Sequence, residues 1–561
     1  MRSNKFIACV LACFFAASMP GQNFQGGIRG TLTDSTGAAI PLAKLTLIEE
    51  STGIARATVA GDDGGYIFSA LNPSTYTIVA EKPGFKRLER KGIVVNTQEF
   101  LGVDLRMEVG EVSESVNVTA DVTAIETTNA STGQVVDNRK LSDLPNMGRN
   151  PFYQTVKISQ NVTPGGDPKF NRMEDQSGSS QISIAGGPVT GNNYMLDGIA
   201  ITDSTNRAVI IPTIESVQEI KLQVNTYDSE VGRTGGGTFN LFLKSGTNDL
   251  HASALAYQWM NDWIANNFFA NATGTPKIPQ MFKNYGGSIG GPVVVPKVYN
   301  GKNKTFFFFT GEAYRQNQTS STFVAVPTAL ERAGDFSQSH YKNGSLQTIY
   351  DPLSTVVNAS GGYTRQAFAG NVIPTSRLNP VGVALAAFYP LPNQANSVYG
   401  ANNFSTTANQ YDRADQMTFK VDQEITSWWR ATVSYLHYGS REPGYTYFPN
   451  VATPNQGLLY RKVDATQANT TLTPSPTLVV ALRWGFNRFP NVTRQLSEGY
   501  NLVSLGFPQS LVSQLPYDAI PALTMSDLQS YGGGGLSSSV FYSRSFSGSA
   551  SKYLGRHSLK W

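Results

Sequence analysis

The chain has 561 residues, of which 15% are charged and 11% aromatic, and its formal net charge is +4. Soluble domains average about 25% charged residues, so this composition is unusual for one, and the small net charge gives no reason to expect a nucleic-acid partner. No run of about 18 apolar residues follows the N-terminus, which argues against a helical membrane span. A membrane β-barrel is compatible with this sequence, because alternating strands give a weak hydropathy signal.

Residues 1–20 have the pattern of a secretory signal peptide. Two basic residues precede an apolar run over residues 6–17, and residues 16–18 at its end are small and suited to cleavage. The only cysteines, Cys9 and Cys13, lie inside this segment. The exported chain is therefore predicted to lack disulfides, as a large hydrogen-bonded envelope protein can. Cys13 lies too early in the apolar run to favour a lipoprotein signal.

Residues 24–108 contain short alternating segments separated by turns. Ile40 to Leu47 and Tyr76 to Ala80 are typical of half-buried strands, and the Gly-rich segment 61–65 is typical of a turn. This spacing predicts a small β-sandwich. The segment from Gly30 to Phe85 resembles the carboxypeptidase regulatory-like domain, which implies an immunoglobulin-like sandwich. One departure is the turn 73–76, Pro-Ser-Thr-Tyr, where that family has Pro-Gly-x-Tyr.

A peptidase activity is not expected from this unit. A zinc peptidase needs imidazole and carboxylate ligands with a general base, and no histidine falls within residues 24–108 or begins a zinc-binding motif. The histidines of the chain are His251, His340, His437 and His557. Asp62 and Asp63 are interpreted as turn residues rather than metal ligands. We therefore predict that the protein is not an enzyme and holds no cofactor or metal.

Residues 111–246 combine helical and strand signals. Val135 to Leu144 predicts a short helix that ends before Pro145. The segment 193–198 predicts a strand that ends in a tight Asp-Gly turn, and Ile214 to Ile220 predicts a helix that leads into a strand. Three glycines at 235–237 then precede a short alternating strand. They are not a phosphate loop, because they precede a strand and lack the Gly-Lys-Ser/Thr ending.

In order and spacing these pieces resemble the plug domain of TonB-dependent outer-membrane receptors, which implies an α/β plug over residues 111–246. Ala185 replaces the arginine that the family's Ile-Arg-Gly strand usually carries. The glycines before the last strand are interpreted as letting the backbone turn tightly. Arg233 is expected either to pair with barrel-wall carboxylates or to be a solvated turn residue. The residues that carry the plug resemblance are Gly186, Gly187, Asp197, Gly198, Glu219, Gly232, Arg233, Gly235, Gly236 and Gly237.

The same resemblance implies a segment before the plug that pairs as a strand with the TonB-type periplasmic energy-coupling protein. Such β-augmentation uses exposed main chain and demands little of the sequence. The alternating candidate consists of Glu111, Val112, Ser113, Glu114, Ser115, Val116, Asn117 and Val118. An ordinary linking strand explains this alternation equally well.

Residues 249–561 are dominated by period-two alternation. Trp429 to Tyr435 and Leu478 to Phe486 both place apolar residues on one face and polar residues on the other. In a third segment, Met417, Phe419 and Val421 alternate with Gln416, Thr418, Lys420 and Asp422. Strands with one lipid-facing and one lumen-facing side are expected in an antiparallel transmembrane β-barrel. A soluble array of β-sandwiches is the alternative, and the signal peptide and the aromatic residues near strand ends argue against it.

Residues 285–293 and 304–314 are similar to strands of the Oar-like group of these receptors. About nine strand candidates follow residue 250, whereas plugged outer-membrane transporters have about 22 strands. Residues 555–561 also stop in mid-alternation. We therefore interpret the sequence as C-terminally truncated, with a partial barrel; the alternative is that Trp561 marks a true last strand.

The fold class expected is thus mainly β: an N-terminal immunoglobulin-like sandwich, an α/β plug and a partial barrel. The resemblance implies a TonB-dependent outer-membrane receptor of the Gram-negative type that transports an unidentified extracellular ligand. Its expected partners are the TonB-type protein, outer-membrane lipid and that ligand, with no nucleic acid. The alternative is an Oar-like surface protein that acts in adhesion or protein export.

Overall fold

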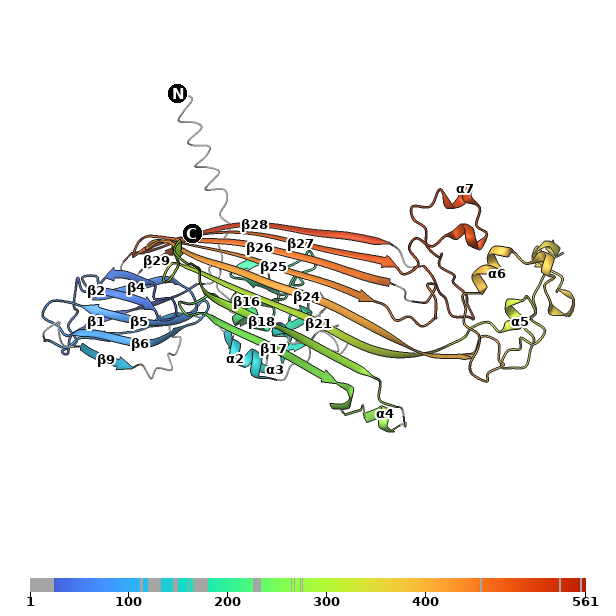
Figure 1. Cartoon of the computed structure of the whole chain (residues 1–561), viewed down its shortest axis with the longest axis horizontal. Coiled ribbons are helices and arrows are strands. Elements are labelled where there is room, and N and C mark those ends of the chain that lie inside the picture. The colour runs from blue at the N-terminus through green and yellow to red at the C-terminus, as the bar shows by residue number, and fades with distance from the viewer. Residues whose placement is uncertain are drawn as a thin grey trace, which may run out of the picture.

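The computed structural model describes residues 25–561, except 111–114, 120–132, 145–149, 160, 165–179, 225–233, 264, 267, 273, 275, 455–456, 534–535 and 555–556. The predicted signal peptide therefore lies outside the described residues. In the described part of the chain, no helix is long and apolar enough to cross a membrane. Figure 1 shows a β-sandwich at one end, a sheet of long strands in the middle and a cluster of loops at the other end.

The N-terminal unit is a sandwich of two sheets, as the sequence predicts. One sheet has the order β4-β1-β7 with β8 also paired to β1, and the other has the order β3-β2-β5-β6-β9. Ile28, Leu45, Phe68 and Ile78 are buried in the core between them, because alternate residues of each strand point inward. The strands are β1 (Gly26–Thr33), β2 (Lys44–Glu49), β3 (Ala55–Val59), β4 (Gly65–Leu71), β5 (Ser74–Glu81), β6 (Arg87–Val95), β7 (Phe100–Gly102), β8 (Leu105–Arg106) and β9 (Ser115–Thr119).

A second unit, here called the central domain, comprises the described residues between 133 and 244. Its main sheet has the order β10-β15-β16-β13-β14, and a separate pair is formed by β11 and β12. Phe152, Tyr194 and Phe239 form an aromatic cluster in its core. The elements are β10 (Gly133–Asp137), α2 (Asn138–Asp143), α3 (Pro151–Ile158), β11 (Val162–Pro164), β12 (Ile182–Ile184), β13 (Asn193–Leu196), β14 (Ile199–Ala200), the 3-10 turn η2 (Ile214–Ser216), β15 (Val217–Val224) and β16 (Gly237–Leu243).

The predicted helix from Val135 to Leu144 is wrong in its first three residues. Residues 135–137 belong to β10, which pairs antiparallel with β15. Val136 is completely buried in this pairing, so tertiary packing decides the conformation. The helix begins only after Asp137, whose side chain accepts a hydrogen bond from the backbone N–H of Lys140 as an N-cap.

The third unit is a nine-stranded antiparallel sheet with the order β17-β18-β21-β24-β25-β26-β27-β28-β29. Its number of strands matches the sequence count. In the described residues β17 and β29 are its two outer strands. The strands are β17 (His251–Met260), β18 (Gln280–Pro292), β21 (Thr305–Val324), β24 (Phe404–Thr426), β25 (Trp429–Pro443), β26 (Gly457–Ser475), β27 (Leu478–Gln495), β28 (Ser537–Leu554) and β29 (His557–Lys560).

The two faces of this sheet differ as the alternation predicts. We call the face that contacts the central domain the inner face and the opposite one the outer face. On β24, Met417 and Phe419 are exposed on the outer face, whereas Thr418 and Lys420 are buried on the inner face. On β27 the exposed Trp484 alternates with the buried Arg483. Apolar groups outside and polar groups inside are the pattern of a membrane barrel wall.

The two ends of the sheet are also different. Short turns join β24 to β25 and β26 to β27 beside the sandwich, while long connections at the far end gather into a loop cluster (Figure 1). Outer-membrane barrels have short periplasmic turns and long extracellular loops, so the sandwich end of this sheet has the character of a periplasmic end. Short elements in the connections are α4 (Phe268–Ala272), β19 (Val294–Val295), β20 (Tyr299–Asn300), α5 (Ala329–Arg332), β22 (Val356–Val357), β23 (Tyr363–Thr364), α6 (Pro380–Ala386) and α7 (Gln509–Val512).

Candidate functional site

The contact between the central domain and the inner face of the long sheet is centred on Asp197 and Lys420. Asp197 and Gly198 form the two-residue turn between β13 and β14, since Leu196 pairs with Ile199. Both turn residues have positive φ, 46° and 77°, as a type I′ hairpin requires. The Asp-Gly turn expected from the sequence is therefore confirmed, and it carries the Asp197 carboxylate into the interior.

Lys420 brings a cation from β24 to this turn. Its Nζ lies 3.5 Å from Asp197 Oδ2, and the two side chains are only 2% and 1% exposed. Nζ also donates to the carbonyl oxygen of Leu243 at 3.0 Å and lies 4.4 Å from the centre of the Phe242 ring. The N–H of Leu243 donates to Asp197 Oδ1 at 3.0 Å. The ammonium group of a strand of the long sheet is thus held by a carboxylate, a carbonyl and an aromatic ring of the central domain.

Burial controls the ionisation of Asp197. It raises the pKa of this carboxyl above its ordinary value, although Lys420 and the N–H of Leu243 act in the opposite direction. The ion pair is therefore sensitive to the loss of either partner, because an unpaired buried charge is strongly unfavourable.

Other inner-face side chains bind the backbone of the central domain. Gln416 donates to the carbonyl of Ile211 at 2.7 Å, and Asn487 donates to the carbonyl of Ala200 at 3.1 Å. The central domain therefore contacts β24 and β27 through hydrogen bonds in which these two strands supply the donors.

The sandwich contacts the central domain through Glu219 and Lys221 of β15. The backbone N–H of Thr97 donates to Glu219 Oε1, and Lys221 Nζ donates to the carbonyl of Gln98 at 3.0 Å. Both side chains are buried. Burial raises the pKa of Glu219, which the hydrogen bond from Thr97 partly offsets. Glu219 was expected as part of the plug signature, and the structure places it where the central domain meets the loop between β6 and β7.

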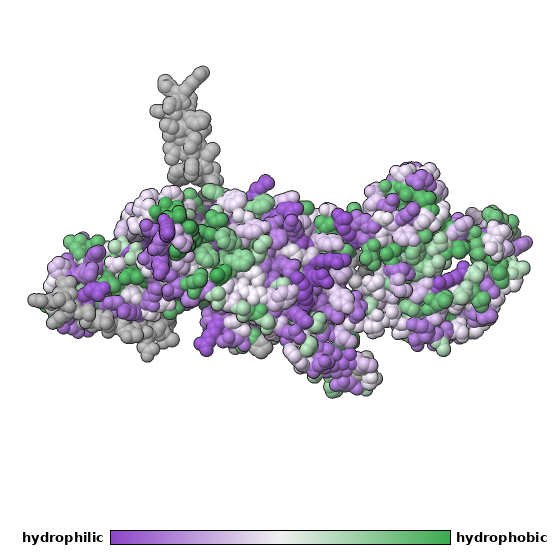
Figure 2. All heavy atoms as spheres, viewed as in Figure 1, coloured by the Kyte–Doolittle hydropathy of each residue, from purple (hydrophilic) through white to green (hydrophobic). Residues whose placement is uncertain are grey.

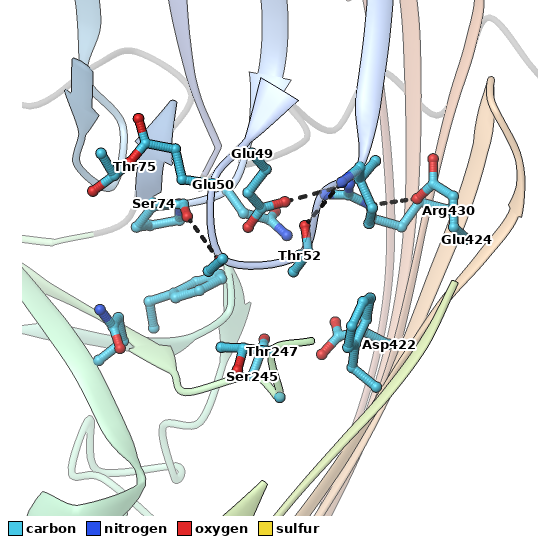
Figure 3. A pocket seen from close by; sticks show the side chains of 18 of the residues that line it. Glu49, Glu50, Thr52, Ser74, Thr75, Ser245, Thr247, Asp422, Glu424 and Arg430 are labelled. Carbon is cyan, nitrogen blue, oxygen red and sulfur yellow. Dashed lines mark hydrogen bonds and ion pairs between the residues drawn. The ribbon is translucent and has the colours of Figure 1, made fainter. Parts of the chain in front are cut away.

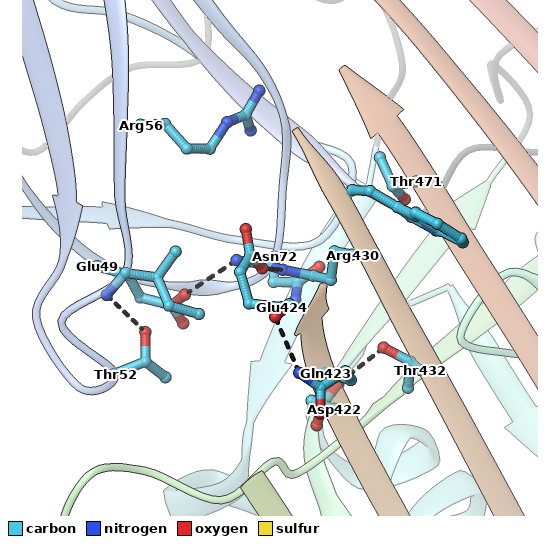
Figure 4. A network of polar contacts seen from close by, with 12 residues as sticks. Glu49, Thr52, Arg56, Asn72, Asp422, Gln423, Glu424, Arg430, Thr432 and Thr471 are labelled. Atoms are coloured by element: carbon cyan, nitrogen blue, oxygen red, sulfur yellow. Dashed lines mark hydrogen bonds and ion pairs between the residues drawn. The ribbon is translucent and has the colours of Figure 1, made fainter. Parts of the chain in front are cut away.

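The sandwich also contacts the long sheet at the β24–β25 turn. Arg430 pairs with Glu424 at 2.9 Å and with Glu49 of the sandwich at 3.8 Å, and Figure 4 shows this network. Nearby, Asn248 donates to the carbonyl of Thr52 at 2.5 Å, and the N–H of Asn248 donates to the carbonyl of Ser51 at 3.0 Å. The segment that leaves the central domain is thus tied to the sandwich.

A cavity of about 470 Å³ lies where the three units meet. Figure 3 shows sandwich residues on one side and Ser245, Thr247 and Asp422 on the other. Four carboxylates and the single guanidinium of Arg430 line it; the carboxylates belong to Glu49, Glu50, Asp422 and Glu424. The cavity is therefore acidic, and residues of all three units line it.

The glycines of the predicted plug signature serve two different purposes. Gly186 has a positive φ of 78° in the turn after β12. A Cβ on Gly187 would lie 2.8 Å from the Gly235 oxygen, and a Cβ on Gly237 would lie 2.7 Å from the Gln223 oxygen. Gly235 and Gly236 lie in a bend before β16, but none of Gly235, Gly236 and Gly237 has a positive φ, so this bend does not use left-handed backbone. A Cβ on Gly236 would clash with the Asn192 side chain, so it and Gly237 permit close approach instead.

Part of the candidate coupling segment and two signature residues fall outside the described residues, namely 111–114, Gly232 and Arg233. The rest of the segment, Ser115 to Val118, lies in β9, which pairs parallel with β6. Ser115 to Val118 thus extend a sheet of the sandwich.

Three contacts could not be assigned from the sequence. Thr97 and Gln98 meet the central domain through backbone groups, which leave no side-chain signal. Lys420 stands in an alternating strand as one more polar residue, although it is the only lysine in the segment 416–422. A single cation on the inward face of this strand was the only sequence signal for its contact with the central domain.

Comparison with known proteins identifies the relatives of this chain. Residues 242–561, more than half of the chain, match the outer membrane beta barrel domain family. Residues 27–108 match the carboxypeptidase regulatory-like domain family. The TonB-dependent transporter Oar of Myxococcus xanthus is 24% identical over 353 residues, which are 59% of this chain and 31% of Oar.

Two solved structures align with part of this chain. The outer membrane transporter YddB from Escherichia coli aligns with a TM-score of 0.46 and 11% identity over 76% of this chain and 47% of YddB. The siderophore receptor PirA from Acinetobacter baumannii aligns with a TM-score of 0.39 and 11% identity over 77% of this chain and 47% of PirA. The chain spans about a third of Oar and about half of each solved relative. It belongs to the outer membrane β-barrel domain family, is a homologue of the TonB-dependent transporter Oar with a carboxypeptidase regulatory-like domain, and resides in the outer membrane.

Proposed function

We propose that the protein is a TonB-dependent transporter in which the central domain is a plug that gates passage of an extracellular ligand. The observation that carries this proposal is the buried contact between Asp197 and Lys420. It joins a separately folded domain to the inner face of a barrel wall by polar groups that can separate and re-form. The homology to Oar supports the same activity.

The polar inner face suits a gate better than a permanent core. Lys420, Gln416 and Asn487 donate to groups of the central domain, and water can satisfy all these donors if the domain moves. Other inner-face polar residues are buried as well, among them Gln467 and Arg483. An interface that stays packed is mostly apolar, because each buried polar group requires a partner.

Energy would reach the plug through residues 111–118, which we propose as the segment that binds a TonB-type protein by β-augmentation. β9 pairs with β6 along one edge, so its other edge is the side on which a partner strand would add. A force applied there would reach Glu219 and Lys221 through β6 and the loop that follows it, which carries Thr97 and Gln98.

Deletion of residues 111–118 tests this function. Cells that produce the chain are given labelled siderophore, oligosaccharide and peptide ligands, with the proton gradient intact or collapsed by an uncoupler. We expect uptake of one class that is lost in the deletion variant and after uncoupling. A matched control deletes eight residues of an extracellular connection, 356–363, and should still bind TonB-type protein. Uptake that persists without residues 111–118 would remove the coupling assignment.

A surface role in adhesion or protein export is the second candidate, and the loop cluster favours it. Its connections share a hydrophobic core that includes Val326, Phe448 and Tyr531. Tyr531 donates to the carbonyl of Leu385 at 2.5 Å, which links two connections. Such a folded module can present a fixed binding surface. Loss of cell attachment with no energised uptake in the same cells would favour this role over transport.

A further inference from the structure

The outer face of the long sheet carries a line of cations across four neighbouring strands. Lys283 of β18 pairs with Arg315 of β21, Arg315 pairs with Arg413 of β24, and Arg413 pairs with Arg441 of β25. We call these four residues the basic row. They alternate with the inward residues of their strands and share the outer face with exposed apolar residues such as Phe309 and Phe419.

This arrangement is unfavourable by itself. Like charges directly opposite each other on neighbouring strands destabilise a sheet. Only Arg315 is neutralised, by Asp415 at 2.8 Å. Within the described residues, the side chains of Lys283, Arg413 and Arg441 form no ion pair or hydrogen bond. The basic row therefore has an excess of positive charge that an external anion would balance.

The basic row lies at the depth of a membrane interface. On β25, Trp429 is at the sandwich end and Arg441 is twelve residues further along the strand. At about 3.4 Å per residue and a tilt of about 40°, this separation corresponds to about 31 Å of height, close to the roughly 30 Å of a bilayer core. On the face shown in Figure 2, apolar surface near the sandwich gives way to hydrophilic surface before the loops. Because the sandwich end of the sheet has the character of a periplasmic end, the basic row lies at the extracellular interface.

We propose that the basic row binds the phosphate groups of an outer-leaflet glycolipid of the lipid A type. Guanidinium groups match phosphate oxygens bidentately, and opposite Cβ atoms on neighbouring strands are about 5 Å apart, so Arg413 and Arg441 can hold one phosphate together. The outer leaflet is the only lipid layer that this height reaches. This site lies on the lipid-facing surface and is independent of the proposed transport path.

Binding of purified lipid A to the full chain in detergent tests the assignment. The binding variant is Arg413→Gln with Arg441→Gln, and the matched control is Lys297→Gln with Lys302→Gln, which removes two exposed cations at the periplasmic end. We expect the binding variant to bind bisphosphorylated lipid A about tenfold to a hundredfold more weakly than the wild type. The control should bind as the wild type does.

Three comparisons test whether the phosphate groups and the glycolipid are what the basic row recognises: dephosphorylated lipid A, a lysine variant and phosphatidylglycerol. Dephosphorylated lipid A should lose the difference between wild type and variant, and Arg413→Lys with Arg441→Lys should restore part of the affinity. Circular dichroism checks that each variant keeps the β-sheet content of the wild type. Equal affinity of the wild type and the glutamine variant for lipid A would overturn the proposal. Equally tight binding of phosphatidylglycerol would overturn the choice of glycolipid.

Discussion

Replacing Lys420 by methionine should free the central domain from the barrel wall. Methionine keeps most of the length of the side chain and removes the charge, so the Asp197 carboxylate stays buried without its cation. The least costly response is protonation of Asp197. With an ordinary carboxyl pKa of 3.8, protonation at pH 7 costs about 4 kcal/mol. Removal of one partner of a buried ion pair is commonly unfavourable by about 3–5 kcal/mol.

Hydrogen exchange of residues 193–200 and 237–243 measures this loss, because both segments carry the Asp197 contacts. The opening free energy should fall by up to about 4 kcal/mol at pH 7 and by less at lower pH, changing by about 1.4 kcal/mol per pH unit. Lys420→Met combined with Asp197→Asn leaves no buried charge and should recover most of the loss. Lys302→Met is the control, since Lys302 is exposed. A loss below about 0.5 kcal/mol, or one independent of pH, would refute the reasoning.

Three further predictions concern the other contacts. Burial raises the pKa of Glu219 above 4.5, so docking of the sandwich should be tightest below pH 4.5 and weaken as pH rises through the raised pKa. Limited proteolysis of the 96–99 loop measures this docking, and Glu219→Gln should remove its pH dependence. An unchanged pH profile in the variant would disprove this role of Glu219. Gly187→Ala should destabilise the central domain by about 1–3 kcal/mol in urea unfolding, because the added Cβ meets Gly235, and a neutral result would contradict the close approach. Trp484→Arg on the outer face should weaken membrane insertion by about 2–4 kcal/mol, measured by folding into vesicles, whereas equal insertion would argue that this face does not meet lipid.

Strand alternation made the long sheet predictable. The period of two on β24 and β27 is a property of each strand alone, so it assigned Phe419 and Trp484 to one face and Lys420 and Arg483 to the other. The Asp197-Gly198 turn was equally predictable, because a two-residue hairpin needs positive φ at both positions. These features depend on local chemistry that the sequence displays.

The misassigned and missed features depend on distant partners. Residues 135–137 carry a helical pattern, but β15 supplies a strand partner for them from a segment about 80 residues away. The close approach of Asn192 to Gly236 and of Gln223 to Gly237 could not be predicted, because both neighbours come from other segments. The contacts of Glu219 with the sandwich involve backbone groups, which no sequence pattern marks.

A reversible cross-link between the central domain and the barrel wall tests the central claim most directly. A Cβ on Gly485 of β27 would lie 3.8 Å from Cβ of Ile199 on β14, which is the usual separation in a disulfide. The only native cysteines lie in the predicted signal peptide, so Ile199→Cys with Gly485→Cys would form the single bridge.

The measurement is energised ligand uptake by cells that carry this double variant, before and after a reductant, with each single cysteine variant as a control. If the central domain must move against the barrel wall, uptake is abolished in the bridged protein and returns to the level of the single variants after reduction. Full uptake by a protein shown to be completely bridged would contradict the account.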